Sequence, residues 1–424
     1  MAALHTVDVT FRQFPLDPRL IHALDDAGFT HCTPIQAESL PVILAGHDLA
    51  GQAQTGTGKT AAFLLAILNL LLTRPPAVPG HKKQPRALII SPTRELAIQI
   101  HKDAVLLNKY ANLTLGLVYG GVDYDKQRAH LAEGVDILIG TPGRLLDYFK
   151  QDIFNLKAVE VFVLDEADRM FDLGFIRDVR YIFRRMCRPQ ERLSMLFSAT
   201  LSFRVTELAY EHMNNPKMIR INPEQVTAER ITQTLYHAGS DEKIPLLLGL
   251  LHRIDPKRTI VFVNTKRTAE KIWGYLEGNN YHAAILSGDV PQHKRQKLFQ
   301  EFSEGKLPIL VATDLAARGL HIPDVSHIFN YDLPQHAEDY VHRIGRTARA
   351  GASGDAVSFV CEEYVFSLAD IESLLGYRIP VSRIDNTLLA TPAPPVAYRI
   401  QRPHGHSHGK HPRSGGHKRQ RRRR

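Results

Sequence analysis

The stretch Ala53-Gln54-Thr55-Gly56-Thr57-Gly58-Lys59-Thr60 decides the fold class of this 424-residue chain, because it has the pattern of a phosphate-binding loop (P-loop). Its small residues let the backbone wrap phosphates and aim N–H groups and a helix N-terminus at them. Lys59 would bring a positive charge to the β- and γ-phosphates of a nucleotide, and the hydroxyl of Thr60 would face Mg²⁺. Ala53 stands where the general pattern has glycine, so a glycine-rich turn that binds nothing is the alternative interpretation.

The acidic segment Asp165-Glu166-Ala167-Asp168 is typical of the part of a nucleotide site that binds Mg²⁺ and water opposite a P-loop. It directly follows the apolar run 161–164, and the carboxyl end of a buried strand is where an open α/β sheet binds its ligand. We expect Asp165 to hold Mg²⁺ through water and Glu166 to orient and deprotonate an attacking water. Solvated loop carboxylates are the alternative, and the P-loop upstream in the same domain counts against them.

Apolar strand-like runs alternate with helical patterns along most of the chain, which predicts parallel sheets with crossover helices. A polar stretch near 222–230 divides the runs into two sets, and the chain is longer than the roughly 250–300 residues at which single cores stop growing. We therefore expect two α/β domains of the P-loop type. The expected parts are a first domain at 1–218, a linker at 219–230, a second domain at 231–385 and a disordered basic tail at 386–424. The expected strands are 87–91, 137–139, 161–164 and 194–197 in the first set and 259–263, 283–286, 309–312, 327–330 and 356–359 in the second.

The net charge of +9 is a property of the C-terminal end. Residues 399–424 contain ten Lys and Arg and no acidic residue, and the remaining 43 basic and 44 acidic residues give 1–398 a net charge of −1. Pro, His and Gly are frequent after residue 385, and the apolar residues there are too few to offset the entropy lost on ordering. Disorder is therefore expected at this end.

The cysteines and the apolar runs bear on the cellular compartment. Cys32, Cys187 and Cys361 are far apart, which supports neither a disulfide framework nor a cysteine-rich zinc site. The longest mainly apolar stretch, 63–72, is well short of the roughly 20 residues of a membrane-spanning helix. No secretory signal is evident at the start of the sequence. We expect a cytoplasmic protein that does not enter a membrane.

The P-loop and the acidic segment together resemble those of the DEAD-box ATP-dependent RNA helicases of superfamily 2, and the resemblance covers residues 8–385. It implies two tandem RecA-like domains. Gly28-Phe29 and Thr33-Pro34-Ile35-Gln36 match the Q motif of that family. By resemblance, Gln36 recognises the adenine edge, for which an amide has a matching donor and acceptor, and Phe11 packs beside the base. ATP with Mg²⁺ is therefore the expected cofactor.

Further blocks match the family in order, and each role below is what that resemblance implies. The matching blocks are 92–97, 120–121, 141–144, 198–200, 264–265, 292–295, 312–319 and 342–349. The implied catalytic residues are Lys59, Glu166 and the arginine fingers Arg346 and Arg349, which would stabilise charge on the γ-phosphate. Nucleotide binding is implied for Phe11, Phe29, Gln36, Ala53, Gln54, Thr55, Gly56, Thr57, Gly58, Lys59, Thr60, Asp165, Asp314 and Gly319.

The implied RNA contacts lie in both domains. They are Thr93, Arg94, Gly120, Thr141 and Arg144 in the first, and Arg295, Thr313 and Arg318 in the second. Contacts to phosphate and sugar position a strand without reading its sequence, so we expect sequence-tolerant binding. Coupling between ATP and RNA is implied for Asp168, Ser198, Thr200 and His342, with ordinary strand-end residues as the alternative for Ser198 and Thr200. Closure on a single strand would disrupt a short duplex, and hydrolysis would reset the open state.

Within the family, three features most resemble the bacterial RhlB-type subfamily: His321, residues 171–176 and residues 378–382. That resemblance implies mRNA decay with the RNA degradosome, with the second domain docked onto an endoribonuclease scaffold and a monomeric core. A helicase of ribosome assembly or cold-shock RNA remodelling is the alternative. His321 replaces an aspartate associated with the nucleotide ribose, where a neutral histidine can still make one hydrogen bond.

Two other classes of function, and three interpretations of the tail, remain to be weighed. A superfamily 2 DNA translocase is disfavoured by the Q motif and by residues 165–168. A silent RNA-annealing module is disfavoured because the implied catalytic residues are all present: Lys59, Glu166, Arg346 and Arg349. The tail is interpreted first as a cationic arm that binds RNA without specificity. A solvating tail and opportunistic metal binding by its histidines are the alternatives.

Overall fold

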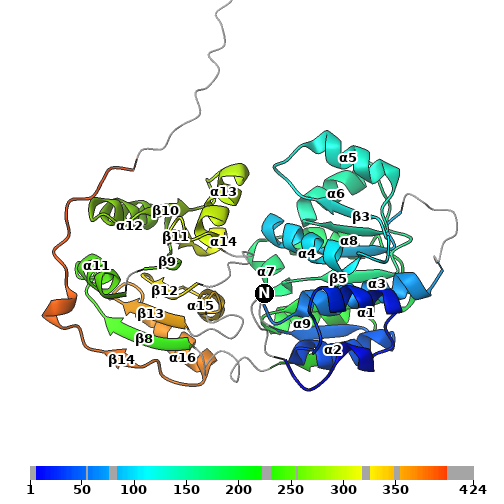
Figure 1. Ribbon diagram of the computed structural model, residues 1–424, viewed down its shortest axis with the longest axis horizontal. Helices are drawn as coiled ribbons and strands as arrows, with labels where there is room; N and C mark the ends of the chain where they lie inside the picture. The colour runs from blue at the N-terminus through cyan, green and yellow to red at the C-terminus, as the bar shows by residue number, and fades with distance from the viewer. Residues whose placement is uncertain are drawn as a thin grey trace, which may run out of the picture.

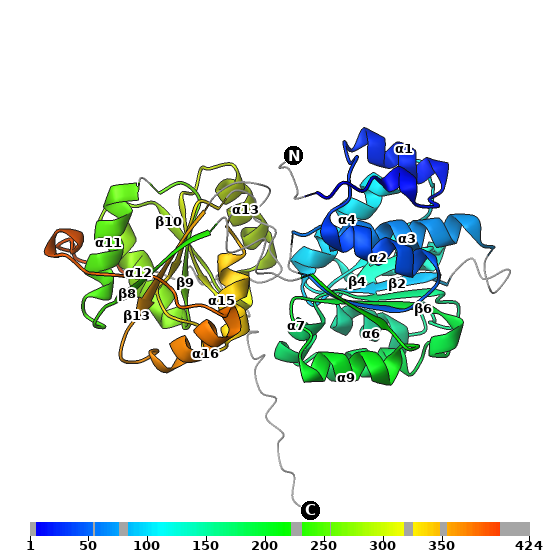
Figure 2. The same cartoon turned by 90° about the horizontal axis from the view of Figure 1, so that it is seen from below.

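The computed structural model describes residues 6–53, 56–75, 84–221, 231–254, 256–317, 325–347 and 354–398. Within these ranges the chain forms two α/β domains, each built on a seven-stranded parallel sheet with helices on both faces (Figures 1 and 2). The predicted tandem α/β architecture is confirmed.

Domain 1 is built around a sheet with the strand order β3-β4-β2-β5-β6-β1-β7. Its strands are β1 (Leu49–Gln52), β2 (Ala87–Ile90), β3 (Leu115–Val118), β4 (Ile137–Gly140), β5 (Val161–Leu164), β6 (Leu193–Ser198) and β7 (Lys217–Arg220). Its helices are α1 (Pro18–Asp26), α2 (Pro34–Leu44), α3 (Lys59–Thr73), α4 (Arg94–Leu107), α5 (Tyr124–Glu133), α6 (Pro142–Lys150), α7 (Ala167–Asp172), α8 (Ile176–Phe183) and α9 (Phe203–His212), with short 3-10 turns η1 (Phe11–Gln13) and η2 (Pro189–Glu191). The inner strands β2 and β5 are buried along their whole length because helices cover both faces of the sheet.

Domain 2 has the strand order β10-β11-β9-β12-β13-β8-β14. Its strands are β8 (Ile231–His237), β9 (Thr259–Val263), β10 (Ala283–Leu286), β11 (Ile309–Thr313), β12 (His327–Asn330), β13 (Gly354–Val360) and β14 (Val381–Ser382). Its helices are α11 (Lys243–Ile254), α12 (Lys266–Gly278), α13 (Gln292–Ser303), α14 (Asp314–Ala317), α15 (Ala337–Ile344) and α16 (Phe366–Leu375), followed by the 3-10 turn η4 (Asn386–Leu388). Counted along the chain, the third, fourth, second, fifth, sixth, first and seventh strands follow one another across each sheet, so the two orders are the same.

The prediction that the chain is disordered from residue 386 onward is wrong for residues 386–398, which we call the strap. The strap follows β14, buries Leu388 and runs along the outer side of α11 and α12 (Figure 1). The prediction failed because it weighed only the apolar residues of the strap itself, whereas contacts with distant helices hold the strap in place. The rest of the predicted tail, 399–424, lies outside the described residues, as does most of the predicted linker.

None of the helices in the described ranges combines the length and the apolar character that a membrane crossing requires.

Candidate nucleotide and RNA site

The P-loop joins β1 to α3, and its two described glycines have positive φ, 87° at Gly56 and 91° at Gly58. A Cβ at Gly58 would collide with the side chain of Gln36, so glycine is required for conformation and for space. Gln36 is buried, and its Nε2 donates to the carbonyl oxygen of Gly58 at 2.9 Å. Its Oε1 accepts from the backbone N–H of Thr33 at 2.8 Å. The start of α2 is therefore bonded directly to the P-loop.

Lys59 and Asp165 form a buried ion pair between the P-loop helix and the end of β5. The distance from Nζ of Lys59 to Oδ1 of Asp165 is 2.9 Å, and both side chains are almost wholly excluded from water. Burial opposes the charged form of Lys59, but Asp165 and Glu166 outweigh it and raise the pKa of this lysine. Oδ2 of Asp165 is buried and has no hydrogen-bond partner among the described residues.

Glu166 follows Asp165 at the start of α7, in the left-handed conformation with φ 50° and ψ 56°. Side chains rarely adopt this conformation, and where it occurs it tends to cluster at active sites. Burial alone would raise the pKa of Glu166, but Lys59, Arg169 and Arg346 outweigh it and hold that pKa below its ordinary value. The carboxylate is thus ionised at neutral pH and able to accept a proton.

Asp168 is bonded to the segment that follows β6. Its Oδ2 accepts hydrogen bonds from the backbone N–H groups of Ala199 and Thr200, both at 3.1 Å. Its own N–H donates to Oγ of Ser198 at 3.1 Å. The structure therefore brings together three of the residues for which coupling was predicted, Asp168, Ser198 and Thr200.

Helix α15 of domain 2 faces this acidic segment. Nε2 of His342 lies 4.0 Å from Oδ2 of Asp168. Arg346, one turn later, is almost buried, and its Nε donates to the carbonyl oxygen of His342 at 3.1 Å. Because Arg346 lowers the pKa of Glu166, its charge reaches the first domain in this arrangement.

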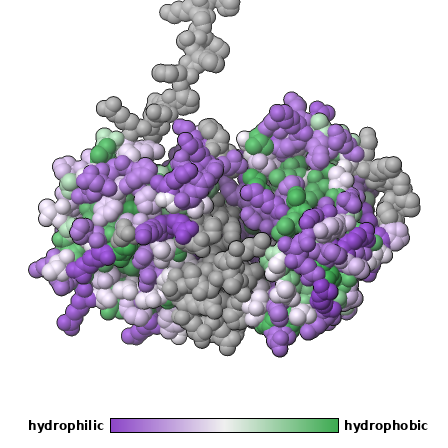
Figure 3. All heavy atoms as spheres, in the orientation of Figure 1, coloured by the Kyte–Doolittle hydropathy of each residue, from purple (hydrophilic) through white to green (hydrophobic). Residues whose placement is uncertain are grey.

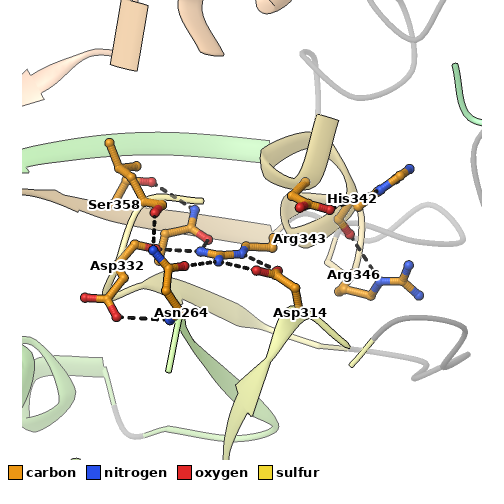
Figure 4. A network of polar contacts seen from close by, with 10 residues as sticks. Asn264, Asp314, Asp332, His342, Arg343, Arg346 and Ser358 are labelled. Atoms are coloured by element: carbon orange, nitrogen blue, oxygen red, sulfur yellow. Dashed lines mark hydrogen bonds and ion pairs between the residues drawn. The ribbon is translucent and has the colours of Figure 1, made fainter. Parts of the chain in front are cut away.

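Arg343 holds α15 in place through a buried polar network (Figure 4). Its guanidinium donates to both carboxylate oxygens of Asp314 at 2.6 Å and to Oδ1 of Asn264 at 2.9 Å. It also donates to the carbonyl oxygen of Asp332 at 2.5 Å. Both oxygens of Asp314, for which nucleotide binding was predicted, are thus bonded to Arg343. The sequence pattern predicts no separate role for Arg343 within the block 342–349, because its partners lie too far along the chain for a local pattern to indicate them.

A second buried ion pair, which the sequence analysis missed, lies beside this network. Nζ of Lys243, the first residue of α11, is 2.7 Å from Oδ1 of Asp332, and both side chains are 4% exposed. Oδ2 of Asp332 accepts from the backbone N–H of Asn264 at 3.0 Å. Lys243 also lies over the ring of Tyr331, with Nζ 4.2 Å from the ring centroid.

Candidate RNA residues of domain 1 lie at the carboxyl ends of neighbouring strands. Thr93 and Thr141 precede α4 and α6, and Oγ1 of Thr93 accepts from the N–H of Leu96 at 3.3 Å. The guanidinium of Arg94 lies against Gly120 and Gly121, where a Cβ on Gly121 would collide with it. On α6, the guanidinium of Arg144 lies over the rings of Tyr124 and Tyr148, with its Cζ 4.9 and 5.4 Å from the two ring centroids.

Arg295 on α13 contacts the first domain. Its Nε lies 3.3 Å from Oε1 of Glu95 on α4, and a nitrogen of the same guanidinium donates to the carbonyl oxygen of Ala316 at 2.9 Å. Thr313 ends β11 and is nearly buried. Figure 3 shows hydrophilic side chains over the upper rim of domain 2 next to domain 1, where α13 lies.

Two of the residues predicted to bind the nucleotide, Phe11 and Phe29, lie in or against the core of domain 1, and several other predicted residues are not described. Phe11 is 3% exposed and belongs to the apolar core of domain 1, with Phe29 packed against that core. Five of the predicted site residues lie outside the described ranges, together with the variant position His321: Gln54, Thr55, Arg318, Gly319 and Arg349.

Two protein families match this chain. The DEAD/DEAH box helicase family matches residues 33–209, and the helicase conserved C-terminal domain matches residues 242–351. Among curated proteins, the ATP-dependent RNA helicase RhlB of Vibrio cholerae serotype O1 is 55% identical over 400 residues, which cover 94% of this chain and 91% of the relative. A protein of the same name from Xanthomonas oryzae pv. oryzae is 58% identical over 391 residues, 92% of this chain and 68% of the relative.

Solved structures of related proteins are similar to this chain in three dimensions as well. S. cerevisiae Dbp5 bound to RNA and ADP BeF3 matches with a TM-score of 0.76 and 32% identity, covering 88% of this chain and 95% of that one. Mss116p bound to ssRNA and AMP-PNP matches with a TM-score of 0.78 and 27% identity, covering 91% of this chain and 82% of that one. The sequence and the arrangement of elements are thus similar to proteins solved with both RNA and a nucleotide.

Proposed function

The chain belongs to the DEAD/DEAH box family of ATP-dependent RNA helicases, and from this premise we propose that its two domains close on single-stranded RNA and ATP and thereby open short duplexes. Hydrolysis of ATP resets the open state. The observation that carries this mechanism is the approach of His342 and Arg346 of one domain to Asp168 and Glu166 of the other. Because the hydrolytic groups are divided between two domains, turnover requires both domains to be in place.

The ATP site is proposed to lie between the P-loop and the acidic segment. Oδ2 of Asp165, which is buried without a hydrogen-bond partner among the described residues, fits a group that binds there. Asp165, through water, and the hydroxyl of Thr60 would hold Mg²⁺, which when bound neutralises charge on the β- and γ-phosphates. Lys59, whose pKa is raised, keeps its positive charge for the same phosphates. Gln36 and Phe11 are proposed to recognise and pack against the adenine.

Glu166 is proposed as the general base because it follows Asp165 at the candidate phosphate site, and its lowered pKa means that the carboxylate is ionised there. Arg346, with Arg349, is proposed to stabilise the charge that develops on the γ-phosphate. Arginine fingers of this kind contribute about 10³–10⁵ in rate, so separated domains would hydrolyse ATP slowly. Asp168, Ser198, Thr200 and His342 would carry the state of the ATP site toward the RNA.

RNA is proposed to cross both domains at the edge where the sheets carry β3 and β10. Thr93, Arg94, Gly120, Thr141 and Arg144 would contact it from domain 1, with Arg295, Thr313 and Arg318 from domain 2. Most of these groups suit phosphate and sugar, so binding would tolerate any sequence. Selection of RNA over DNA would rest on contacts with 2′-hydroxyl groups.

The test is ATP turnover by the purified chain with single-stranded RNA or with DNA of the same sequence. We expect RNA to stimulate turnover and DNA to leave it near the basal rate. The control Lys59→Ala should show no stimulation by either. Equal stimulation by DNA would contradict the RNA-specific part of the proposal and favour a DNA translocase.

A role in cytoplasmic mRNA decay is proposed from the relatives named RhlB, with an endoribonuclease scaffold of the RNA degradosome bound to domain 2. Domain 2 exposes two large apolar side chains that such a partner could cover. Phe366 on α16 is 86% exposed, and Val381 on the short edge strand β14 is 60% exposed. A helicase of ribosome assembly or cold-shock remodelling remains the alternative role.

Binding of the purified scaffold segment to the full chain tests this partner. Phe366→Ser should weaken the complex at least about tenfold, since an aromatic residue central to an interface often contributes about 2 kcal/mol or more. Phe203→Ser is a matched control, because Phe203 is 82% exposed but belongs to domain 1. If both variants bind like the unaltered chain, the scaffold does not dock at α16 and β14.

A further inference from the structure

Helix α8 of domain 1 and the residues that follow it carry a concentration of positive charge. Residues 176–188 contain five arginines and one aspartate, which gives this segment a net charge of +4. Subtracting them from the 43 basic and 44 acidic residues of 1–398 leaves 38 basic and 43 acidic residues, a net charge of −5. The segment is therefore opposite in sign to the rest of the chain before residue 399.

The helical period places part of this charge on the outer side of α8. Val179, Ile182 and Phe183 are buried in the core on the sheet face that α6 and α9 also cover. At about 100° per residue, Arg177 and Arg184 project on the opposite side of the helix. Both are exposed. The outer side of α8 thus presents guanidinium groups to solvent.

Tyr181 brings two further cations together between α8 and α6. Phe149 of α6 packs edge-on against its ring, with the two centroids 6.4 Å apart. Cζ of Arg185 lies 4.5 Å from the centroid of Tyr181, and Nζ of Lys150 lies 5.7 Å from it. Attraction to the ring offsets part of the repulsion between these two exposed cations. We define the α8 surface as Lys150, Arg177, Tyr181, Arg184 and Arg185.

Neighbouring acidic side chains leave the charge of the α8 surface unneutralised. Glu211 of α9 pairs with Arg180, at 2.9 Å, rather than with a member of this surface. Asp147 on α6 accepts from Nε2 of Gln151 at 2.9 Å, and Asp178 is half-buried. Across the part of the chain that the structure describes, no ion pair joins a cation of the α8 surface to an acidic residue. The surface therefore suits a negatively charged partner.

Helix α6 connects the α8 surface to the candidate RNA path. It begins after Thr141, and its first turn bears Arg144, both of which are candidate RNA residues. Lys150, the last residue of α6, is six residues after Arg144, a rise of about 9 Å along the helix. Helices α6 and α8 lie side by side (Figure 1). RNA that leaves the cleft over α6 would meet the α8 surface within a few nucleotides.

We propose that the α8 surface binds the phosphates of RNA that extends beyond the cleft between the two domains. Guanidinium groups often hold a phosphate through two parallel hydrogen bonds, and phosphate contacts do not depend on sequence. This inference rests on the proposed RNA helicase function. It adds a site that belongs to domain 1 alone, so the flanking RNA stays bound when the domains separate after hydrolysis.

The experiment measures the affinity of the full chain for two RNAs over a range of salt concentrations, with a non-hydrolysable ATP analogue present. One RNA is a short single strand that covers only the cleft, and the other is the same strand extended at both ends. Each phosphate contact with a single strand adds about 0.7 to the slope of log affinity against log salt. Three contacts would steepen the slope for the long RNA by about 2, which corresponds to about 20-fold in affinity from about 50 to about 200 mM salt.

Arg177→Gln/Arg184→Gln/Arg185→Gln removes three cations and leaves the buried side of α8 unchanged. We expect the slope for the long RNA to fall by about 2 in this variant. Binding of the short RNA, and the ATP turnover that it stimulates, should be retained. The basic residues of 399–424 are the same in both chains, so the difference isolates the α8 surface.

A matched control removes the same charge from the other side of domain 1. Arg19→Gln/Lys102→Gln/Lys109→Gln changes exposed positions on α1 and on and just after α4, helices that cover the opposite face of the sheet (Figure 2). This variant should keep the slope of the unaltered chain for the long RNA. An equal loss in both triple variants would show that net charge, and not the α8 surface, holds the RNA.

Tyr181 distinguishes an organised group of cations from loose positive charge. Tyr181→Phe keeps a ring beside Arg185 and Lys150 and should bind the long RNA as the unaltered chain does. Tyr181→Leu removes the ring and should weaken binding of the long RNA about twofold to fivefold at low salt. Unchanged affinity in the leucine variant would overturn the role of the ring in this site.

The inference is overturned if the α8 triple variant keeps the full salt slope for the long RNA. The arginines would then bind a different acidic partner or only solvate the helix. Failure of the proposed function gives a different result, because the unaltered chain would then show no ATP turnover stimulated by the short RNA.

Discussion

Glu166 combines three properties that rarely occur in one residue: a left-handed backbone, burial, and a pKa held below its ordinary value by surrounding cations. The strain and the burial both cost stability. A residue kept at such a cost is best explained by its chemistry, which under the proposed function is the removal of a proton from water.

Glu166→Gln keeps the shape of the side chain but removes the base. We expect ATP turnover to fall at least about 100-fold, while ATP and RNA still bind together. Single-turnover hydrolysis and equilibrium binding of the two ligands give the two readouts. Glu133→Gln, on the exposed side of α5, is the control and should hydrolyse normally. Near-normal hydrolysis by the Glu166 variant would mean that another group activates the water.

Asp103 on α4 offers a stability prediction with a definite sign. Burial raises its pKa to about 6, even though Nε2 of Gln99 donates to it at 2.9 Å. An acid whose pKa is higher in the folded state binds protons on folding, so its ionisation destabilises the fold as pH rises from about 4 to about 6. Asp103→Asn should therefore stabilise the chain by on the order of 1–2 kcal/mol above pH 6 and by little below pH 4. Denaturant unfolding at pH 7.5 and pH 4 checks this, and an equal effect at both values would exclude the titration of Asp103 as the cause.

At the scale of elements, the position of α15 depends on Arg343, a side chain that points away from domain 1. Arg343 is 1% exposed and bonds to Asp314, Asn264 and the backbone of Asp332 (Figure 4). His342 on the same helix and Arg346, two residues after its end, face domain 1. The position of these two residues is thus set by a network whose bonded partners among the described residues, Asp314, Asn264 and Asp332, all belong to domain 2.

Arg343→Met removes a fully buried guanidinium and leaves the carboxylate of Asp314, whose side chain is 20% exposed, without its cation. Loss of one partner of a buried pair typically costs about 3–5 kcal/mol, and we expect the lower end of that range here. Lys297→Met removes an exposed ion pair on α13 and should change stability by less than about 1 kcal/mol. Thermal and denaturant unfolding of the two variants provide the comparison. A similar effect of both substitutions would show that the network does not stabilise domain 2.

Elements with their own periodic pattern could be predicted from the sequence, and elements held by distant contacts could not. The apolar runs 161–164, 259–263, 283–286 and 327–330 correspond residue for residue to β5, β9, β10 and β12. The edge strand β14 has only two residues, and the edge strand β3 is a half-buried run of four that glycine interrupts, so neither stands out in the sequence. The strap is the clearest example, because its backbone packs against Gly249, Gly274 and Gly278, more than a hundred residues earlier in the chain. No local sequence pattern indicates contacts at such a separation.

The same division holds within the candidate site. The P-loop and the acidic segment are each an unbroken stretch of sequence that can be recognised locally. The structure places Lys59 of the first beside Asp165 of the second, as the two motifs together predict. The pairing of Arg343 with Asp314, of Lys243 with Asp332 and of Arg295 with Glu95 depends on the fold and on the placement of the two domains. Residue type alone could indicate that these side chains bear charge but could not identify their partners.

At the scale of the whole molecule, the ion pair between Arg295 and Glu95 joins the domains beside the candidate RNA path. The distance is 3.3 Å, and both side chains are mostly shielded from water. Glu95→Gln should therefore widen the distribution of distances between the domains without RNA or ATP, shifting the equilibrium about fivefold for a pair that contributes about 1 kcal/mol. Energy transfer between one dye on each domain measures the shift. Arg12→Ala, which removes an exposed pair within domain 1, should leave the distribution unchanged, and the same insensitivity in the Glu95 variant would show that the pair does not hold the domains.

The shared strand order of the two sheets has a consequence for the ancestry of the chain. The first strand of each sheet leads to a helix whose first residue is a lysine, and that lysine pairs with an aspartate that follows the fifth strand: Lys59 with Asp165, and Lys243 with Asp332. Two copies of one ancestral unit would leave this pattern after duplication. In the second domain the charged pair lies in a packed interior, over the ring of Tyr331. The carbonyl oxygen of its aspartate accepts a hydrogen bond from Arg343, so the pair that corresponds to Lys59 and Asp165 helps to hold α15 in place.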